Sequence, residues 1–488
     1  MDDAANVKKV DDFIISGRRA SIQMPMNETD VSYSSVWKFI HGELHMSKMY
    51  MAHRMASTSA ALAISTFQGV FFTFIYILAV APVCVSSRYN YEVVYAWKVI
   101  DYNWPSPKDR EEAVENGDYI PKNNVISGVK IWEDRVYVTV PRLVPGVPST
   151  LNWVPWVPAT EWNLYSKKEP LSTPLTPFPC MESQKPGDCY AIQNVQSMEI
   201  DPLGRMWVLD VGRRNLMTPV PDNKCSPKIL ILDLKNGGKQ LRMHVFPEEV
   251  ASRNDSFLND LVVDVNGSPD GSDWFAYISE SGGPPDRGGA IVVYDLKNDE
   301  SWKVIDPSSM SFDLSASTAR IGGQTAKLIF NVDGIALSPV GKEQSFVYYC
   351  PLGSLHLYSI PASVLRTVKD QNVTQYVRDL GKKRSQTDGM MMDNRGQLYY
   401  GMLTEDALAR VNQRDLIRSN GKRVNEKVVL KDQRLEWIDG LGFDWTKHLW
   451  FVTNRLQNLQ AKAVKTSEIN YRLNRFNARA MSYMYPQH

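Results

Sequence analysis

A short pattern recurs six times along this 488-residue chain and restricts its fold more than any other feature of the sequence. In each copy a serine or aspartate precedes a short apolar run, a polar turn follows, and a second run rich in aromatic residues completes a pair of strands. The copies lie at residues 125–140, 195–210, 258–279, 331–350, 386–402 and 437–453. Their leading residues are Ser127, Ser197, Asp260, Asp333, Asp388 and Asp439, at steps of 70, 63, 73, 55 and 51 residues.

These steps leave room for two further strands in each interval, which gives six units of four strands. The pattern predicts an all-β protein, a six-bladed β-propeller with four-stranded blades. We expect it to span residues 88–465. Two β-sandwiches would not repeat six times, and no repeated segment has the length or the 3.6-residue period of a helix. Residues 466–488 include a helix-favouring run, so we expect a C-terminal tail that lies across a blade or frays.

A glycine follows the leading aspartate in the last three copies, at Gly334, Gly389 and Gly440. In a propeller the innermost strands of all blades converge on one axis, and a residue without a side chain lets them approach closely. The preceding side chains then point together at one mouth of the central channel.

The convergence of four carboxylates admits three interpretations. The aspartates contact a ligand, or they hold a Ca²⁺ ion or act as general acids and bases, or they accept backbone N–H groups of their own turns. The candidate ligand-binding residues from this ring are Asp260, Asp333, Asp388 and Asp439.

The N-terminal part of the chain predicts export from the cytoplasm. Residues 60–87 contain no charged side chain. Their apolar part, the 26 residues 60–85, is long enough for a helix to cross a bilayer. It reads as a type II membrane anchor behind a cytoplasmic tail, or as a signal peptide whose true start is a later methionine. We expect residues 1–59 to be a disordered extension or a mispredicted start. In either case the remainder faces outward.

Cysteines and glycosylation triplets agree with an oxidising compartment. Apart from Cys84 in the apolar segment, the chain has Cys180, Cys189, Cys225 and Cys350, which allow two disulfides in three connectivities. Asn-x-Ser/Thr triplets predict glycosylation in the outward part at Asn254, Asn266 and Asn372.

The composition excludes several classes of function. The 55 basic and 54 acidic residues leave no surplus of Lys and Arg for a nucleic-acid surface. The outward part has four histidines and no HExxH pattern, which argues against a zinc hydrolase and a two-copper oxidase. No nucleophile elbow and no phosphate-binding loop are present. We therefore expect no nucleic-acid partner, no cofactor apart from Ca²⁺ in the channel, and no membrane partner if the N-terminal segment is cleaved.

Between the repeats, "RVYVTVPRLVPGVPSTLNWV", "GRMWVLDVGRRN", "FAYISESGGPPDRGGAIVVYDLKNDESWKV" and "NRLQ" stand in the order of a known family. With these motifs the chain resembles the insect yellow and major royal jelly proteins from about Tyr91 to Leu459. The resemblance implies a secreted six-bladed propeller associated with melanin, cuticle or eggshell, and a channel that in salivary members binds biogenic amines. Relatives usually have "LQFPSD" where this chain has "LEWIDG" (435–440), so its Asp439 is a departure.

The "TNRLQ" motif adds two candidate ligand contacts. Asn454 and Leu456 match positions that resemble ligand contacts in amine-binding members of the family. The alternative is that Asn454 caps the strand end and Arg455 pairs with an acid. We expect a secreted yellow-like protein of cuticle or eggshell pigmentation and hardening, whose channel holds a small aromatic amine or catechol. The other candidate is an enzyme that converts dopachrome by tautomerisation or decarboxylation.

Overall fold

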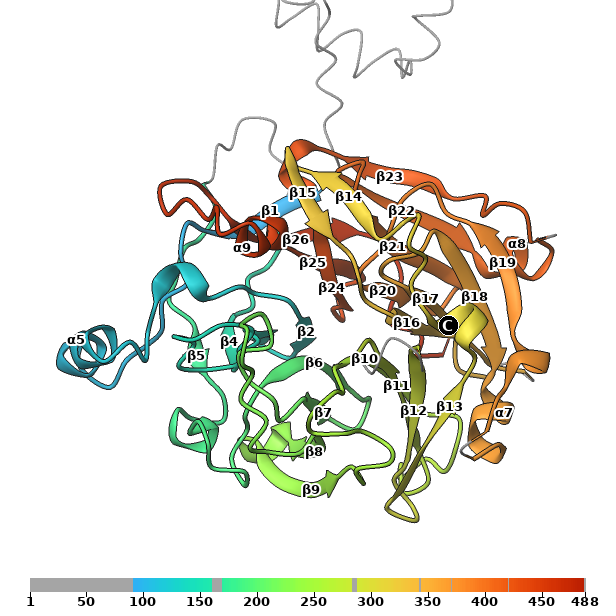
Figure 1. Cartoon of the computed structure of the whole chain (residues 1–488), viewed down its shortest axis with the longest axis horizontal. Coiled ribbons are helices and arrows are strands. Elements are labelled where there is room, and N and C mark those ends of the chain that lie inside the picture. Colours follow the sequence, from blue (N-terminus) through green and yellow to red (C-terminus); the bar gives the residue numbers. More distant parts are fainter. Residues whose placement is uncertain are drawn as a thin grey trace, which may run out of the picture. The chain divides into compact units, whose positions relative to one another are not determined.

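The computed structural model of the protein describes residues 91–159, 169–282, 288–341, 344–369, 371–419 and 421–486. Six four-stranded antiparallel sheets stand around a common centre (Figure 1). The predicted all-β, six-bladed propeller is confirmed. The expected N-terminal extension and apolar segment lie outside the described residues. Within the described ranges no helix has the length and apolar character needed to cross a membrane.

Each of the first five blades is one continuous stretch of chain, and its first strand is the innermost one. Blade 1 contains β2 (Val129–Trp132), β3 (Arg135–Thr139), β4 (Leu151–Pro155) and β5 (Thr176–Pro177). Blade 2 contains β6 (Val195–Ile200), β7 (Arg205–Asp210), β8 (Lys228–Asp233) and β9 (Lys239–Val245). Blade 3 contains β10 (Leu258–Asp264), β11 (Phe275–Glu280), β12 (Ala290–Asp295) and β13 (Glu300–Ile305). Blade 4 contains β16 (Val332–Leu337), β17 (Phe346–Pro351), β18 (His356–Pro361) and β19 (Arg378–Lys382). Blade 5 contains β20 (Met390–Met392), β21 (Gln397–Met402), β22 (Ala407–Asn412) and β23 (Lys427–Lys431).

Blade 6 joins the two ends of the propeller and corrects our C-terminal boundary. Its strands are β24 (Ile438–Phe443), β25 (His448–Thr453), β26 (Tyr471–Asn477) and β1 (Tyr91–Trp97). Strand β26 pairs antiparallel with β25 on one side and with β1 on the other. The expected end of the propeller at residue 465 is therefore wrong. The helix-favouring residues after it form a strand because two partner strands offer backbone hydrogen bonds that local propensity cannot outweigh.

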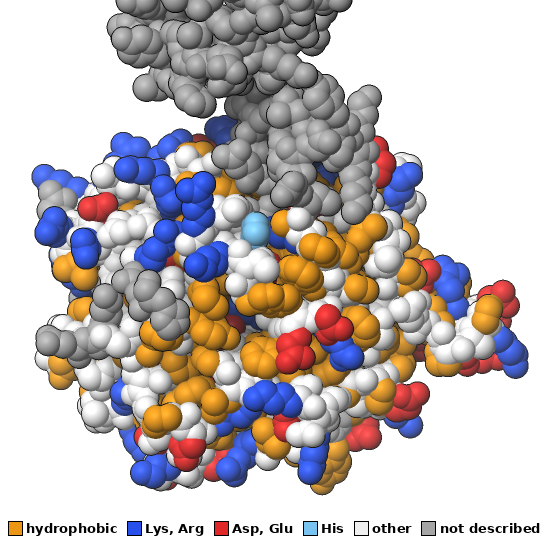
Figure 2. Space-filling view, turned by 180° about the vertical axis from the view of Figure 1, so that it is seen from behind, with side chains coloured by type: hydrophobic (Ala, Val, Ile, Leu, Met, Phe, Trp, Pro, Cys, Tyr) orange, Lys and Arg blue, Asp and Glu red, His pale blue; other side chains and the backbone are white. Residues whose placement is uncertain are grey.

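A few short elements decorate the blades. The helices are α5 (Pro107–Glu115), α6 (Pro307–Met310), α7 (Ala362–Thr367), α8 (Gln413–Ile417) and α9 (Leu456–Gln460). A separate hairpin, β14 (Thr318–Ile321) with β15 (Gln324–Lys327), lies between blades 3 and 4 in the sequence and contacts α9. On the face seen in Figure 2, hydrophobic side chains gather towards the centre and charged ones lie mainly around them.

Neighbouring innermost strands approach as closely as the repeated glycines predicted. A side chain on Gly389 would place its Cβ 2.4 Å from the carbonyl oxygen of Asp439, and one on Gly440 would meet the carbonyl oxygen of Ser127 at 2.6 Å. The N–H of Gly440 donates to that same Ser127 oxygen at 2.8 Å. Blade 6 is thereby tied to blade 1 at the axis.

A second aspartate, at the far end of the innermost strand, fixes the turn to the next strand. Asp444 accepts hydrogen bonds from the backbone N–H groups of Thr446 (2.9 Å) and His448 (3.0 Å) and from Nε1 of Trp450 (2.8 Å). Equivalent aspartates in blades 2, 3 and 5 are Asp201, Asp264 and Asp393. This aspartate explains the recurrent polar turn followed by an aromatic strand.

The residues that follow β26 cross the end of the channel at which these turns lie. The N–H of Asn394 in blade 5 donates to the carbonyl oxygen of Met481, and that of Val340 in blade 4 donates to Tyr483. The Tyr483 hydroxyl reaches blade 3, where it accepts from the N–H of Val263 at 2.8 Å and donates to the oxygen of Val263 at 3.0 Å. Residues 478–486, here called the C-terminal segment, therefore connect three blades.

Candidate functional site

The opposite end of the channel opens through a funnel that contains most of the predicted ligand-binding residues. Its lining includes Asp333, Asp388, Asp439, Asn454 and Leu456. Aromatic and apolar neighbours in the lining are Val125, Pro141, Leu143, Met217, Phe257, Phe330, Leu352 and Trp437. The sixth predicted residue, Asp260, lines the adjoining cavity further along the channel, which shares the other three aspartates with the funnel. The structure thus places five of the six predicted side chains in the funnel and the sixth in the adjoining cavity, while ligand binding by them stays a prediction.

The free space among these side chains is small. The funnel has a cavity volume of about 30 Å³ and the adjoining cavity one of about 20 Å³. Spaces of this size hold one or two water molecules. An aromatic ring therefore enters the funnel only when side chains at its rim turn aside, whereas a small charged group needs little extra room.

Asp333 and Asp388 form a buried carboxyl pair at the base of the funnel. Burial, the neighbouring Asp388 carboxyl group and Asp439 together raise the pKa of Asp333 well above its usual range. Burial also raises the pKa of Asp388 to about 6, although hydrogen bonds from Trp437 and Asp333 act in the opposite direction. Nε1 of Trp437 donates to Oδ2 of Asp388 at 2.6 Å. Because two close carboxylates repel each other, the pair retains a proton near neutral pH.

Asp439 is held by the predicted partner residue of the last blade. Nδ2 of Asn454 donates to Oδ2 of Asp439 at 2.7 Å and to the carbonyl oxygen of Ile126 at 2.9 Å. Oδ1 of Asn454 accepts the N–H of Leu456, the first residue of α9, at 3.1 Å. Burial and the nearby Asp388 raise the pKa of Asp439 well above its usual range, and the Asn454 hydrogen bond only partly offsets them.

The remaining members of the ring, Asp260, Ser127 and Ser197, form hydrogen bonds with neighbouring protein groups. Oγ of Ser197 donates to Oδ1 of Asp260 at 2.7 Å. Burial raises the pKa of Asp260, against the influence of Lys130. Ser127 lies within 3.0 Å of the Thr139 hydroxyl and donates to the carbonyl oxygen of Gln196. These two serines are engaged in the protein's own hydrogen bonds.

Sequence reasoning missed a lysine inside the channel. Nζ of Lys130 lies 3.1 Å from Oε2 of Glu199, and both side chains are almost fully buried. Lys130 stands three residues after the leading Ser127, and Glu199 stands two residues after the leading Ser197. Most of the matching positions in the later repeats are apolar, so a charged residue at these positions was the signal available in the sequence. Glu199 and the four aspartates thus place five carboxyl groups beside the single amino group of Lys130.

The carboxyl groups are not arranged as a metal centre in the described part of the chain. No three His, Cys, Asp or Glu side chains there lie close enough to hold an ion. Ca²⁺ in the channel stays an untested prediction.

Two residues next to the predicted site residues of the last blade have an unusual backbone conformation. Trp437, which is fully buried, has φ = 52°, and Arg455 has φ = 49°. A bulky residue rarely adopts the left-handed region without a structural or functional reason. Arg455 is held by Glu436 and Glu468, each at 3.2 Å, as the alternative reading of the motif proposed. Trp437 was not predicted as a site residue, although its place two residues before Asp439 could have indicated it.

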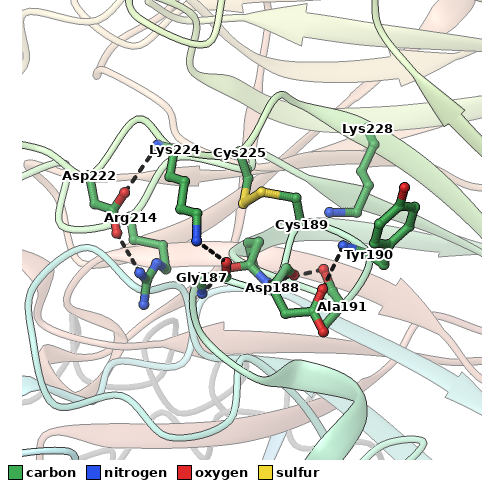
Figure 3. Close-up of a disulfide and its surroundings, with 12 residues drawn as sticks. Gly187, Asp188, Cys189, Tyr190, Ala191, Arg214, Asp222, Lys224, Cys225 and Lys228 are labelled. Carbon is green, nitrogen blue, oxygen red and sulfur yellow. Dashed lines mark hydrogen bonds and ion pairs between the residues drawn. A yellow bond between two sulfur atoms is a disulfide. The ribbon is translucent and has the colours of Figure 1, made fainter.

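One disulfide stabilises the loops on the funnel side of blade 2. Cys189 and Cys225 are joined, and the bond connects the loop before β6 to the loop between β7 and β8 (Figure 3). The second loop carries Met217 to the funnel. Our expectation of a second disulfide is wrong, because Cys180 is a free exposed thiol and Cys350 is a free buried one.

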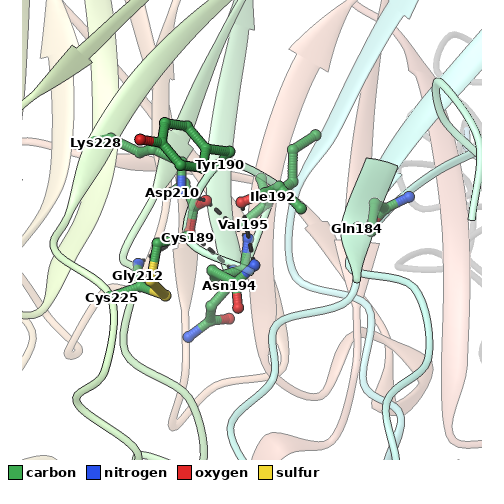
Figure 4. Close-up of polar contacts among 12 residues, drawn as sticks. Gln184, Cys189, Tyr190, Ile192, Asn194, Val195, Asp210, Gly212, Cys225 and Lys228 are labelled. Carbon is green, nitrogen blue, oxygen red and sulfur yellow. Dashed lines mark hydrogen bonds and ion pairs between the residues drawn. A yellow bond between two sulfur atoms is a disulfide. The ribbon is translucent and has the colours of Figure 1, made fainter. Parts of the chain in front are cut away.

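A buried ion pair lies beside the disulfide (Figure 4). Nζ of Lys228 is 2.8 Å from Oδ2 of Asp210, and both side chains are buried. Asp210 also accepts the N–H groups of Gln193 and Asn194, each at 2.8 Å. Burial alone would raise the pKa of Asp210, but Lys228 and the N–H groups of Gln193 and Gly212 outweigh it and lower the pKa. The carboxylate is thus a structural anchor for the loop before β6.

The predicted glycosylation residues differ in their surroundings. Asn254 and Asn372 are exposed. Asn266 is half-buried, and its Nδ2 donates to Oδ1 of Asp264 at 3.0 Å while its Oδ1 accepts the N–H of Gly341. Glycosylation stays a prediction for all three, and Asn266 would have to give up these contacts.

Comparisons with known proteins agree with the motifs. The family model described as major royal jelly protein matches residues 193–485. Major royal jelly protein 1 of Apis mellifera is 27% identical over 400 residues, which cover 78% of this chain and 86% of the relative. Major royal jelly protein 8 of the same species is 29% identical over 362 residues, with 72% and 78% covered. Dopaminechrome tautomerase of Drosophila melanogaster is 26% identical over 410 residues, with 80% and 83% covered. The chain belongs to the major royal jelly protein family.

Proposed function

We propose that this protein is an extracellular, non-catalytic member of the yellow type that binds a small aromatic amine or catecholamine at the funnel and acts in cuticle or eggshell pigmentation and hardening. The observation that carries the proposal is the surplus of buried carboxyl groups in the channel. Four aspartates face one lysine, and that lysine is already paired with Glu199.

An ammonium group is the natural complement of this surplus. It would enter the small space beside Asp439 and Asp388, while an attached ring would pack against rim residues such as Leu456 and Phe330. A charge-assisted hydrogen bond to a carboxylate is worth about 1.5–3 kcal/mol in a site that excludes water. A bound cation also lowers the pKa of nearby carboxyl groups, so binding should release protons.

Isothermal titration calorimetry with dopamine and with 4-ethylcatechol, which lacks the amine, tests the proposal. We expect dopamine to bind at least tenfold more tightly, with a heat that changes with the ionisation enthalpy of the buffer because protons are released. Asp439→Asn should remove the preference. Equal binding of the two compounds, or no binding in the millimolar range, would contradict an amine site.

An enzymatic function is the second candidate, favoured by the Asp333–Asp388 pair. A carboxylate whose pKa is about 6, next to a protonated carboxyl group, can take a proton from one carbon of an aminochrome and return one to another atom. Such a tautomerisation moves one proton and needs no oxidant. The relative named dopaminechrome tautomerase supports this candidate.

Loss of dopaminechrome absorbance, followed in a spectrophotometer, distinguishes the two candidates. Catalysis would convert many equivalents of the compound, and Asp388→Asn would reduce the rate by about 100-fold or more. A rate equal to that of the buffer alone would leave the binding function.

The extracellular location is supported by the Cys189–Cys225 disulfide, since such bonds persist mainly in oxidising compartments. Expression of the full chain in insect cells tests it. We expect the protein in the medium, and retention of all of it in the cytosol would contradict the proposal.

A further inference from the structure

A second and larger cavity lies at the other end of the channel from the funnel. It has a volume of about 340 Å³ and lies among three segments: the β2–β3 turn, the β24–β25 turn and the C-terminal segment. Both turns connect the first and second strands of their blades, and these turns lie at the end of the channel that the C-terminal segment crosses. None of its lining residues belongs to the funnel.

The lining of this cavity is aromatic and acidic. The described residues that form it are Ile131, Trp132, Glu133, Phe443, Asp444, Trp445, Met481, Ser482 and Tyr485. Four of the nine are aromatic, two are acids, and neither Lys nor Arg is among them. Lys447 and Arg479 belong to the same segments but are not part of the lining.

The acids and rings are held in place before any ligand arrives. Hydrogen bonds from the turn and from Trp450 fix the Asp444 carboxylate, and together with His448 they lower its pKa to about 2 despite its burial, so it is ionised at neutral pH. The Trp445 ring lies 4.8 Å from that of Trp156 and is 44% exposed. Glu133, at the tip of the β2–β3 turn, is exposed.

From these features we propose that the cavity is a second binding site, for a small organic cation with apolar substituents such as a quaternary or tertiary ammonium compound. The negative faces of aromatic rings attract such cations, and the attraction grows when water is excluded. The exposed carboxylate of Glu133 adds to the same potential, whereas the Asp444 carboxylate, which has His448 and several hydrogen-bond donors beside it, mainly holds its turn in place. The apolar substituents would be covered by Trp445, Phe443 and Met481.

Size separates this site from the funnel. A volume of 340 Å³ lies within the range of small-molecule sites, whereas the funnel's 30 Å³ holds a quaternary ammonium group only if rim side chains turn aside. The inference therefore stands whether or not the funnel binds amines. Since the C-terminal segment forms one wall, a bound cation would also stabilise that segment.

Calorimetry and tryptophan fluorescence with choline, compared with its neutral isostere 3,3-dimethyl-1-butanol, test the proposal on the intact protein. We expect choline to bind at least fivefold more tightly and to change the fluorescence of the exposed Trp445. Trp445→Ala should weaken choline binding by about tenfold and Glu133→Gln by about threefold. Glu115→Gln, which changes an exposed acid of α5 outside the cavity, is the matched control and should bind choline as the natural protein does.

Three outcomes would overturn the proposal: equal affinity for choline and the neutral isostere, no binding in the millimolar range, or unchanged binding in Trp445→Ala. Asp439→Asn identifies the site that is occupied. If that change abolishes choline binding while Trp445→Ala does not, the cation lies in the funnel and the second site is refuted. Unfolding curves of each variant verify that its fold is retained.

Discussion

Asp439 is the second residue of strand β24 and Asp444 directly follows the strand, and the pKa values of the two carboxyl groups shift in opposite directions. Asp439 at the funnel has a pKa well above its usual range, while Asp444, five residues later, has a pKa of about 2. Burial acts on both carboxyl groups in the same direction. The difference lies in their partners: Asp444 accepts hydrogen bonds from backbone N–H groups and from three side chains, and Asp439 faces other carboxyl groups and one asparagine amide.

This comparison distinguishes carboxyl groups that stabilise the propeller from carboxyl groups that can bind a ligand or exchange a proton. A buried carboxylate surrounded by donors is part of the framework, because its charge is already compensated. A buried carboxyl group beside others costs free energy in the folded state, which a cationic ligand or a bound proton can offset. The two ends of one strand thus give Asp444 a structural role and place Asp439 where a ligand or a bound proton can act.

The largest expected effect comes from deleting the C-terminal segment. A chain that ends at Asn477 loses the buried Tyr483 and Met484 side chains and their contacts with three blades. We expect its free energy of unfolding to fall by about 4 kcal/mol, measured by urea denaturation. Tyr483→Phe, which removes only the hydroxyl contacts with Val263, should cost about 1 kcal/mol. An unchanged stability of the shortened chain would show that this end of the channel does not depend on the segment.

Replacing the turn aspartate should come next in size. Asp444→Ala leaves the N–H groups of Thr446, His448 and Trp450 without their acceptor and should reduce the free energy of unfolding by about 3 kcal/mol. Thermal unfolding at pH 7 measures it. Because the folded pKa is lowered, the stabilisation by Asp444 is present above the ordinary pKa of 3.8 and is lost as the pH falls towards 2. The variant should therefore lack that acid-dependent loss.

The pH dependence of stability should have the opposite sign at the funnel. The folded state binds the Asp388 proton more tightly than the unfolded state, so its contribution is most favourable below pH 3.8 and is lost as the pH rises to about 6. We expect a difference on the order of 2 kcal/mol between pH 4 and pH 7 when the natural protein is compared with Asp388→Asn. If the free energies of unfolding of the two proteins changed with pH in the same way, the pKa of Asp388 would not be raised in the folded state.

The smallest effect should be a gain. Asp439→Asn keeps an acceptor for Asn454 and removes the cost of a buried acid among acids. We expect the variant to be more stable than the natural protein by about 1 kcal/mol at pH 7. Guanidinium denaturation of the two proteins measures the difference. A loss of stability comparable to that of Asp444→Ala would remove the distinction between the two ends of β24.

Much of the fold was predictable because its signals are periodic. The recurring aspartate, glycine, turn and aromatic strand gave the number of blades, the innermost strands and the gathering of Asp260, Asp333, Asp388 and Asp439. Each of these features is local in sequence and repeated, so one copy supports the next. Gly440 is a clear case, because the backbone of Ser127 in the first blade leaves no room for a side chain at this position.

The features that the sequence did not indicate depend on contacts between distant segments. Strand β26 has a helix-favouring sequence and becomes a strand only between β25 and β1. Free thiols at Cys180 and Cys350 reflect where the fold places them, which spacing does not encode. The Lys130–Glu199 pair joins two blades, and although each charge was visible in the sequence, their contact across 69 residues was not. Trp437 belongs to the site because it donates a hydrogen bond to Asp388, which lies 49 residues earlier in the chain.

The pairing of β1 with β26 has a consequence for biosynthesis. Tyr91 lies opposite Phe476, so the first strand leaves the ribosome 385 residues before its partner. At ordinary rates of translation this delay is on the order of 20 to 80 seconds. During that time β1 has no partner and the last blade cannot be completed, which exposes strand edges that other chains can pair with. The ring can close only after synthesis is nearly finished, so nascent chains should need protection by chaperones until then.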